Sequence, residues 1–252
     1  MTNKLFDKRI AVVTGGRSGI GAAMCNRFLG HGAQVVSLDL YENVSKDQNI
    51  GIVEIECDVT NQDSLKAAFD QIKKKFHKID ILCVNAGIVP AWSRSAETSF
   101  ETWDRVMAIN VIGAAMTLQN SIEILTKPGA AVLFTGSINS WKGDGNISSY
   151  VASKHAILGI IKSAAIDLGI DGIRVNGIAP GPIATDALLN RIKNRSSSDE
   201  KIFNETLEKL NSGTALKRMA TVEEVVNLAE FLLSDLASGI TGQLVTVDCG
   251  IL

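Results

Sequence analysis

The sequence lacks the features of secreted, membrane-spanning and nucleic-acid-binding chains. Its four cysteines are scattered, with no C-x-x-C pair or Cys/His cluster, which predicts a reduced, metal-free, cytoplasmic protein. No apolar run approaches the roughly 18 residues of a membrane span, and the first residues lack the apolar core of a signal peptide. With a net charge of −2 there is no basic stripe for nucleic acid, and the one basic run, "KKKFHK" (73–78), ends a predicted helix, where cations are favoured.

Proline is also rare, with 4 residues against 22 glycines, and 46% of the chain is hydrophobic. These proportions suit a packed globule with many tight turns. Apolar runs of strand character alternate with helical patterns. The expected strands are 9–14, 34–39, 51–58, 80–85, 130–136, 172–180 and 244–248, and the expected helices are 19–31, 61–77, 99–126, 150–169 and 221–234. Such alternation predicts one doubly wound α/β domain whose parallel sheet of about seven strands is flanked by helices.

Two connections depart from this rhythm. The connection from Asp39 to Gly51 is short, so a second helix there should be stunted. Residues 183–220 form a long insertion whose middle, "RIKNRSSSDEK" (191–201), is polar and charged. Long connections in compact domains are usually functional or disordered. The composition fits either a substrate lid within about 183–212 or a surface loop, and its place after a strand end favours the lid.

The turn after the first strand reads "TGGRSGIGAAM" and fits T-G-x-x-x-G-x-G through Thr14, Gly15, Gly19 and Gly21. Glycines there allow a tight turn and let backbone N–H groups approach a pyrophosphate at a helix N-terminus. A plain strand–helix turn is the alternative, but the position after the first strand of an α/β pattern favours a dinucleotide.

Asp39 ends the second expected strand, 18 residues beyond Gly21. A carboxylate there accepts hydrogen bonds from both adenosine ribose hydroxyls and repels a 2′-phosphate, which favours NAD over NADP. Arg17 is the opposing signal, because its guanidinium suits a phosphate. Asp58, at the end of the third strand, is placed to accept from the adenine amino group; the structural alternative is that it caps the next helix, and the two roles are compatible.

Only two tyrosines are present, and Tyr150 lies four residues before Lys154 in "SYVASKHAILG" (149–159). On a helix this spacing places the phenol and the ammonium on one face. The pair is either a packed tyrosine with a lysine beside it or an acid–base device. Ser137 lies at the C-terminal end of another expected strand, where doubly wound sheets bind ligands.

The ordered motifs "TGGRSGIG" (14–21), "DV" (58–59), "NAG" (85–87), Asn110, Ser137, "YVASK" (150–154) and "PGPIAT" (180–185) carry a resemblance that covers essentially the whole chain. The sequence resembles the short-chain dehydrogenase/reductase family. That resemblance implies a single NAD(P)-binding Rossmann-type domain over 1–252 that exchanges hydride between a nicotinamide and a carbon–oxygen group. Cys249, where relatives often have glycine, is a departure outside the chemical motifs.

The resemblance implies four catalytic residues. Tyr150 would be the general acid/base, Ser137 would bind the reacting oxygen, and Asn110 would hold a water that links Lys154 to solvent. Lys154 would bind the nicotinamide ribose. Its ammonium should also favour the phenolate, whose unperturbed pKa is near ~10.

The resemblance also implies a larger set of cofactor residues. These are Gly15, Arg17, Ser18, Gly19, Ile20, Gly21, Asp39, Asp58, Val59, Asn85, Ala86, Gly87, Tyr150, Lys154, Pro180, Gly181, Ile183 and Thr185. Four of them have structural alternatives: Asn85 to Gly87 as a strand end, and Thr185 as the N-cap of the following helix.

The substrate pocket is expected to include Ser137, Asn139, Trp141, Ile147 and Tyr150, with Val89, Trp92 and the lid nearby. Trp92 and Trp141 suit packing or oligomer contacts as well as they suit contacts with the substrate. The mostly apolar set suits a small secondary alcohol, polyol, sugar or cyclic alcohol and its ketone.

Two other functions stay open. An NADPH-dependent 3-oxoacyl-thioester reductase would want a basic residue near position 39 or 40, where the chain has Asp39 and Leu40. A non-catalytic dinucleotide sensor could share the fold but could lose the Tyr or Lys. Relatives usually pair the helices expected at 99–126 and 150–169 between subunits, which implies a homo-oligomer, a tetramer in preference to a dimer.

Overall fold

The computed structural model describes residues 4–40, 51–196 and 199–251. Its described strands form one parallel sheet in the order β3-β2-β1-β4-β5-β6-β7. The strands are β1 (Ile10–Thr14), β2 (Gln34–Asp39), β3 (Ile52–Glu56), β4 (Ile81–Val84), β5 (Ala131–Thr135), β6 (Arg174–Pro180) and β7 (Leu244–Val247). The predicted seven-stranded, doubly wound sheet is confirmed.

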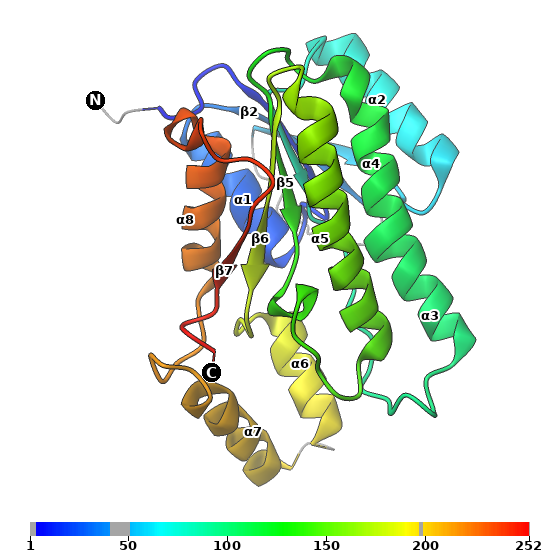
Figure 1. Ribbon diagram of the computed structural model, residues 1–252, viewed down its shortest axis with the longest axis vertical. Helices are drawn as coiled ribbons and strands as arrows, with labels where there is room; N and C mark the ends of the chain where they lie inside the picture. Colours follow the sequence, from blue (N-terminus) through cyan, green and yellow to red (C-terminus); the bar gives the residue numbers. More distant parts are fainter. Residues whose placement is uncertain (1–3, 41–50, 197–198, 252) are drawn as a thin grey trace.

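Helices cover both faces of this sheet (Figure 1). The described α-helices are α1 (Gly19–Gly30), α2 (Gln62–Phe76), α3 (Phe100–Met107), α4 (Ala114–Ser121), α5 (Ser148–Gly169), α6 (Asp186–Arg195), α7 (Glu200–Ser212) and α8 (Val222–Leu233). On one face, Phe28 of α1 and Leu232 of α8 belong to a single buried apolar cluster. On the other, Phe69 of α2, Leu118 of α4 and Ile161 of α5 form a second cluster. Burial on both faces explains why every residue of β1 is apolar or Thr.

The start of α2 differs from one alternative considered for Asp58. Asn61 is the N-cap, and its side-chain oxygen accepts from the backbone N–H groups of Asp63 at 2.9 Å and Ser64 at 3.1 Å. The Asp58 carboxylate instead accepts from the N–H and hydroxyl of Thr60, at 2.8 and 2.7 Å. Asp58 therefore does not cap the helix.

The expected helix at 99–126 is interrupted. A π-helical turn, η2 (Ala108–Gly113), separates α3 from α4, and a 3₁₀ turn, η3 (Ile122–Ile124), follows α4. A Cβ atom on Gly113 would lie 2.9 Å from the Val59 side chain and 3.0 Å from its carbonyl oxygen. The lack of a side chain at Gly113 thus lets the helix approach the end of β3 closely.

The insertion at 183–220 holds two helices, α6 and α7, where sequence composition left a lid and a loop undecided. Figure 1 shows both beyond the end of the sheet at which β6 ends. A parallel bridge joins Ile183 to Ala220, so the insertion begins and ends at one place. The stunted helix expected after Asp39 falls at 41–50, outside the described residues. In the part of the chain that is described, no helix is long and apolar enough to cross a membrane.

Candidate active site

The candidate site lies at the point where the order of the strands reverses, between β1 and β4. After β1 the chain builds β2 and β3 on one side, and β4 lies on the other side of β1. The loops that leave β1 and β4 therefore part at the C-terminal edge, which is where doubly wound sheets bind ligands.

The loop from β1 into α1 is shaped by glycine. Gly15 and Gly19 have φ values of +65° and +51°, a region that L side chains rarely adopt, and a Cβ atom on Gly21 would collide with the Gly15 carbonyl. Beyond Gly19 the space is open. The backbone N–H groups of Gly19, Ile20 and Gly21 are the first of α1. The N-cap residue, Ser18, makes no side-chain hydrogen bond to this end of the helix. This open, N–H-lined turn fits the pyrophosphate of a dinucleotide.

Asp39 lies beside this turn at the end of β2. One carboxylate oxygen accepts from the Arg17 backbone N–H at 3.0 Å and the other from the Leu40 N–H at 2.8 Å. The Arg17 guanidinium donates to Glu54 at 2.8 Å and to the Leu40 carbonyl at 3.0 Å, and its side chain is only 7% exposed. The charge of Arg17 is therefore engaged by a carboxylate on β3.

Asp58 lines a cavity at the same end of the sheet. The cavity has a volume of about 430 Å³, and its other lining residues include Leu40, Glu54 and Ser64. Val59, also predicted at the cofactor, has its side chain in the core beside Gly113. Only the backbone of Val59 is therefore placed to serve a ligand.

Asn85 at the end of β4 joins three elements. Its amide nitrogen donates to the carbonyls of Thr14 at 3.0 Å and Gly15 at 3.2 Å, and its amide oxygen accepts from the Thr135 hydroxyl at 2.9 Å. The backbone N–H groups of Asn85 and Ala86 both donate to the Thr14 hydroxyl. Asn85 thus holds the glycine turn against the ends of β4 and β5, and Gly87 follows at an exposed position.

Tyr150 and Lys154 lie in the first turns of α5, as the spacing predicts. The Lys154 ammonium lies 5.6 Å from the centre of the Tyr150 ring and donates to the Thr135 carbonyl at 2.7 Å. Ser137 follows β5, and its side chain is close enough to the phenol to act on the pKa of Tyr150, in the lowering direction. Three side chains from two elements therefore meet at the C-terminal edge of the sheet.

Burial dominates the electrostatics of this cluster. It raises the pKa of Tyr150, while the Ser137 side chain and the charge of Arg191 act in the opposite direction. Burial also lowers the pKa of Lys154 to about 8. The chain's own groups therefore leave the pKa of the phenol above its ordinary value, and the expected help of Lys154 together with an oxidised nicotinamide stays a prediction.

Asn110 lies in the π turn and connects two loops. Its side chain accepts from the Ile88 N–H at 2.8 Å, donates to the Ile88 carbonyl at 2.9 Å and donates to the Ser153 hydroxyl at 3.1 Å. Ser153 in turn donates to the Tyr150 carbonyl at 2.7 Å. Asn110 therefore ties the loop after β4 to the turn of α5 that carries Tyr150.

The predicted substrate residues separate into two groups. Asn139 is buried; its N–H donates to the Ser137 hydroxyl at 3.2 Å, and its amide oxygen accepts from that hydroxyl at 3.3 Å. Ile147 is also buried, beneath the start of α5. Trp141 and Val89 are exposed, at 47% and 39%. Asn139 thus orients Ser137, and Trp141 lies at the protein surface.

The "PGPIAT" segment continues β6 into the insertion. A Cβ atom on Gly181 would lie 2.9 Å from Asp248, so glycine is needed after the buried Pro180. Thr185 caps α6, because its hydroxyl accepts from the Leu188 N–H at 3.3 Å. The N-cap alternative for Thr185 is therefore observed, with Ile183 buried just before it.

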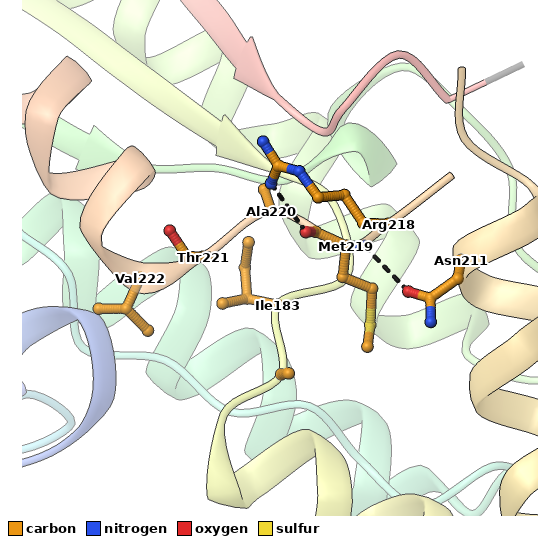
Figure 2. A pocket seen from close by; sticks show the side chains of 8 residues that line it. Ile183, Asn211, Arg218, Met219, Ala220, Thr221 and Val222 are labelled. Atoms are coloured by element: carbon orange, nitrogen blue, oxygen red, sulfur yellow. Dashed lines mark hydrogen bonds between the residues drawn. The ribbon is translucent and has the colours of Figure 1, made fainter. Parts of the chain in front are cut away.

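Figure 2 shows a cavity of about 290 Å³ at the base of the insertion. Ile183, Asn211 and Met219 are among its lining residues, and the Met219 N–H donates to the Asn211 side chain at 3.0 Å. The cavity contains none of the residues around Tyr150. It lies where the two ends of the insertion meet.

Sequence reasoning missed a cluster of arginine side chains from the insertion around Trp92. The guanidinium groups of Arg191 and Arg195, one helical turn apart on α6, lie 5.1 and 4.5 Å from the centre of the Trp92 ring. The i, i+4 spacing was visible in the sequence, but nothing there indicated which face of α6 would meet the loop after β4.

Comparisons with known proteins agree with this geometry. A family model described as Enoyl-(Acyl carrier protein) reductase matches residues 15–252. Short-chain dehydrogenase reductase 3a of Arabidopsis thaliana is 34% identical over 259 residues, covering 99% of this chain and 97% of that protein. Secoisolariciresinol dehydrogenase of Forsythia intermedia is 32% identical, covering 97% of this chain and 89% of that protein.

Solved structures give the same result. Ligand-free aldohexose dehydrogenase of Thermoplasma acidophilum has a TM-score of 0.89 at 29% identity, covering 97% of this chain and 94% of that one. Levodione reductase has a TM-score of 0.86 at 27% identity, covering 97% of both chains.

The fold and the site together define an oxidoreductase that acts on CH–OH or carbonyl groups with a nicotinamide dinucleotide. The chain belongs to the short-chain dehydrogenase/reductase family.

Proposed function

We propose that this protein is an NAD-dependent dehydrogenase that interconverts a secondary alcohol (small alcohol, polyol, sugar or cyclic alcohol) and its ketone. The observation that carries the proposal is the meeting of Tyr150, Ser137 and Lys154 at the C-terminal edge of the sheet. These side chains supply a proton-transfer group, a hydrogen bond for the reacting oxygen and a buried cation. The structurally similar aldohexose dehydrogenase and levodione reductase, by their names, act on an aldohexose and on levodione.

The nicotinamide, when bound, supplies or accepts the hydride. In alcohol oxidation, the Tyr150 oxygen takes the hydroxyl proton of the substrate, and in ketone reduction the phenol returns it. The Ser137 hydroxyl binds the same substrate oxygen and stabilises its developing charge. Because burial alone raises the pKa of Tyr150, the phenolate needs the neighbouring cations, and Lys154 is the nearest on the same helix.

The cofactor residues fit a dinucleotide without a 2′-phosphate. Asp39 presents a carboxylate beside the glycine turn, and Arg17, which suits a phosphate, is already paired with Glu54. A 2′-phosphate would meet the charge of Asp39 and would compete with Glu54 for Arg17. This pairing supports NAD over NADP and disfavours an NADPH-dependent 3-oxoacyl-thioester reductase.

The experiment is a plate of secondary alcohols, polyols, sugars and ketones, run with NAD(H) and NADP(H) and followed through the nicotinamide absorbance. Turnover is expected with NAD(H), and Tyr150→Phe should lower kcat by roughly 10²- to 10⁴-fold while NADH binding, followed by fluorescence, is retained. Near-wild-type kcat in Tyr150→Phe would overturn the acid/base role. Binding of NADH with no turnover of any compound would support the sensor function instead.

We also propose a homo-oligomer, a tetramer in preference to a dimer, and a cytoplasmic location. Large apolar side chains on α3 and α5 are exposed, among them Phe100 at 88% and Ile166 at 77%. Such residues are typical of subunit contacts. All four cysteines are free thiols, which suits a reducing compartment. Light scattering of the wild type and of Ile166→Glu tests the assembly: a lower mass in the variant is expected, and an unchanged mass would exclude this face.

A further inference from the structure

The lid helix α6 carries a guanidinium that is held in place by an aromatic ring. Arg191 and Arg195 lie over Trp92, which belongs to the loop between β4 and α3. Of these two arginines, Arg195 is exposed, whereas Arg191 is half-buried. Stacking on Trp leaves the edge of a guanidinium free to donate hydrogen bonds in its plane.

This cluster is adjacent to the reacting groups. The Ser93 N–H, next to Trp92, donates to the Asn146 carbonyl at 2.8 Å, which fixes the tryptophan loop against the segment that leads into Tyr150. The positive charge of Arg191 is close enough to Tyr150 to lower the pKa of the phenol. The Trp92 contact and the Ser93–Asn146 hydrogen bond thus place Arg191 on the side of the insertion that faces the segment leading into Tyr150.

Within the described residues, Arg191 has no anion of its own. Its Nε atom is buried without a hydrogen-bond partner, and none of the ion pairs found in that part of the chain includes its guanidinium. Burial lowers the pKa of Arg191, and the charges of Tyr150 and then Asp144 act in the opposite direction. Asp144, on the loop before α5, is exposed and forms no ion pair with Arg191. Burying an uncompensated charge is unfavourable unless a ligand supplies the counter-charge.

We propose that Arg191 binds a carboxylate of the substrate, so that the alcohol or ketone handled by Tyr150 is a hydroxy acid or oxo acid. A planar guanidinium pairs with a carboxylate through two parallel hydrogen bonds, and the contact with Trp92, 5.1 Å from the guanidinium carbon to the ring centre, restricts where that guanidinium lies. Arg195 extends the stack but remains in solvent. This inference rests on the proposed dehydrogenase function and narrows its substrate class.

The test compares hydroxy acids of increasing chain length with their own methyl esters, using NAD and three variants. Arg191→Met removes the charge and keeps an apolar side chain. Arg191→Lys keeps the charge and removes the planar guanidinium that forms two parallel hydrogen bonds. Arg195→Met is the matched control, because Arg195 contacts the same ring. For Arg191→Met, KM for the best acid is expected to rise roughly 10- to 100-fold, with little change for its ester. For Arg191→Lys, KM for the acid should lie between the values for the wild type and for Arg191→Met. Arg195→Met should change KM less than about 3-fold.

The outcomes separate this inference from the proposed function. Turnover of neutral alcohols in preference to acids, or equal losses for acid and ester in Arg191→Met, would overturn the carboxylate site and leave the dehydrogenase intact. The same losses in Asp144→Asn as in Arg191→Met would show that the arginine serves an internal ion pair instead, and would also overturn the site. Absence of NAD(H)-linked turnover with every compound would overturn the proposed function itself.

Discussion

The Arg17 guanidinium donates to the Glu54 carboxylate at 2.8 Å, with the arginine side chain almost completely buried. Arg17 belongs to the glycine turn and Glu54 to the middle of β3, so the ion pair crosses the end of β2 close to Asp39. Two carboxylates therefore decide what the one arginine of this turn can bind.

Removing these carboxylates should admit NADP. Asp39→Ala is expected to raise kcat/KM for NADP relative to NAD by about 10- to 100-fold, because a charge that repels the 2′-phosphate is lost. Adding Glu54→Gln should raise the ratio further by releasing Arg17. Glu56→Gln, an exposed carboxylate at the end of β3, is the control. An unchanged ratio in Asp39→Ala would place Asp39 away from the ribose.

The buried ammonium of Lys154 should lower the free energy of unfolding at neutral pH. Burial lowers its pKa from 10.5 to about 8, and a shift of this size corresponds to about 3 kcal/mol. Between those two pH values the unfolded chain binds a proton that the native state does not, so native stability rises with pH across that window.

Lys154→Met should therefore raise the free energy of unfolding at pH 7, by about 1–3 kcal/mol after loss of the hydrogen bond to Thr135. The gain should shrink above about pH 8 and vanish near the unperturbed lysine pKa of about 10.4. Urea unfolding of the ligand-free protein at several pH values measures it, with the exposed Lys162→Met on the same helix as control. A variant less stable than wild type at pH 7 would contradict the burial penalty.

Asn110 should contribute to both stability and turnover. Asn110→Ala removes three hydrogen bonds of a buried side chain, to the N–H and carbonyl of Ile88 and to Ser153, and should lower the free energy of unfolding by about 2 kcal/mol. Ser153→Ala removes only one of these and should cost less. Urea titration with parallel kinetics gives both quantities. Equal, small losses in the two variants would show that the loop after β4 does not depend on Asn110.

Gly21→Ala should weaken cofactor binding more than it weakens the fold. The added methyl would collide with the Gly15 carbonyl and distort the glycine turn. NADH affinity, followed by fluorescence titration, is expected to fall at least about 10-fold. Gly30→Ala, in the same helix, has open space at its Cβ position and serves as the matched control. Wild-type affinity in Gly21→Ala would mean that the turn does not hold the dinucleotide.

Periodicity identified the elements of the sheet because buried parallel strands are continuous apolar runs and the long helices have regular apolar faces. The strand ends at Thr14, Asp39 and Val84 therefore match closely. The π turn around Asn110 was not predicted, since one extra residue in a helical turn leaves the composition unchanged. The sequence also motivated the pairing of Tyr150 with Lys154, because i, i+4 neighbours on a helix must meet.

Contacts between distant segments were beyond the reach of such patterns. The stacking of Arg191 on Trp92 joins positions far apart in the sequence, and the engagement of Arg17 by Glu54 crosses from one side of β2 to the other. Desolvation of Tyr150 likewise depends on what surrounds the phenol in three dimensions. The proposals for substrate and cofactor rest on these contacts, which is why the family was easier to predict than the specificity.

The insertion that carries α6 and α7 leaves and rejoins the domain at one place. Its two ends meet at the bridge between Ile183 and Ala220, and a second bridge joins Thr214 to Ile251 beside the C-terminus. The hydrogen bonds around Asn85 and Lys154 lie outside it. We therefore expect the segment between Ile183 and Ala220 to be exchangeable, so that grafting the corresponding segment of another enzyme of this family transfers substrate preference while the proton-transfer residues stay in place.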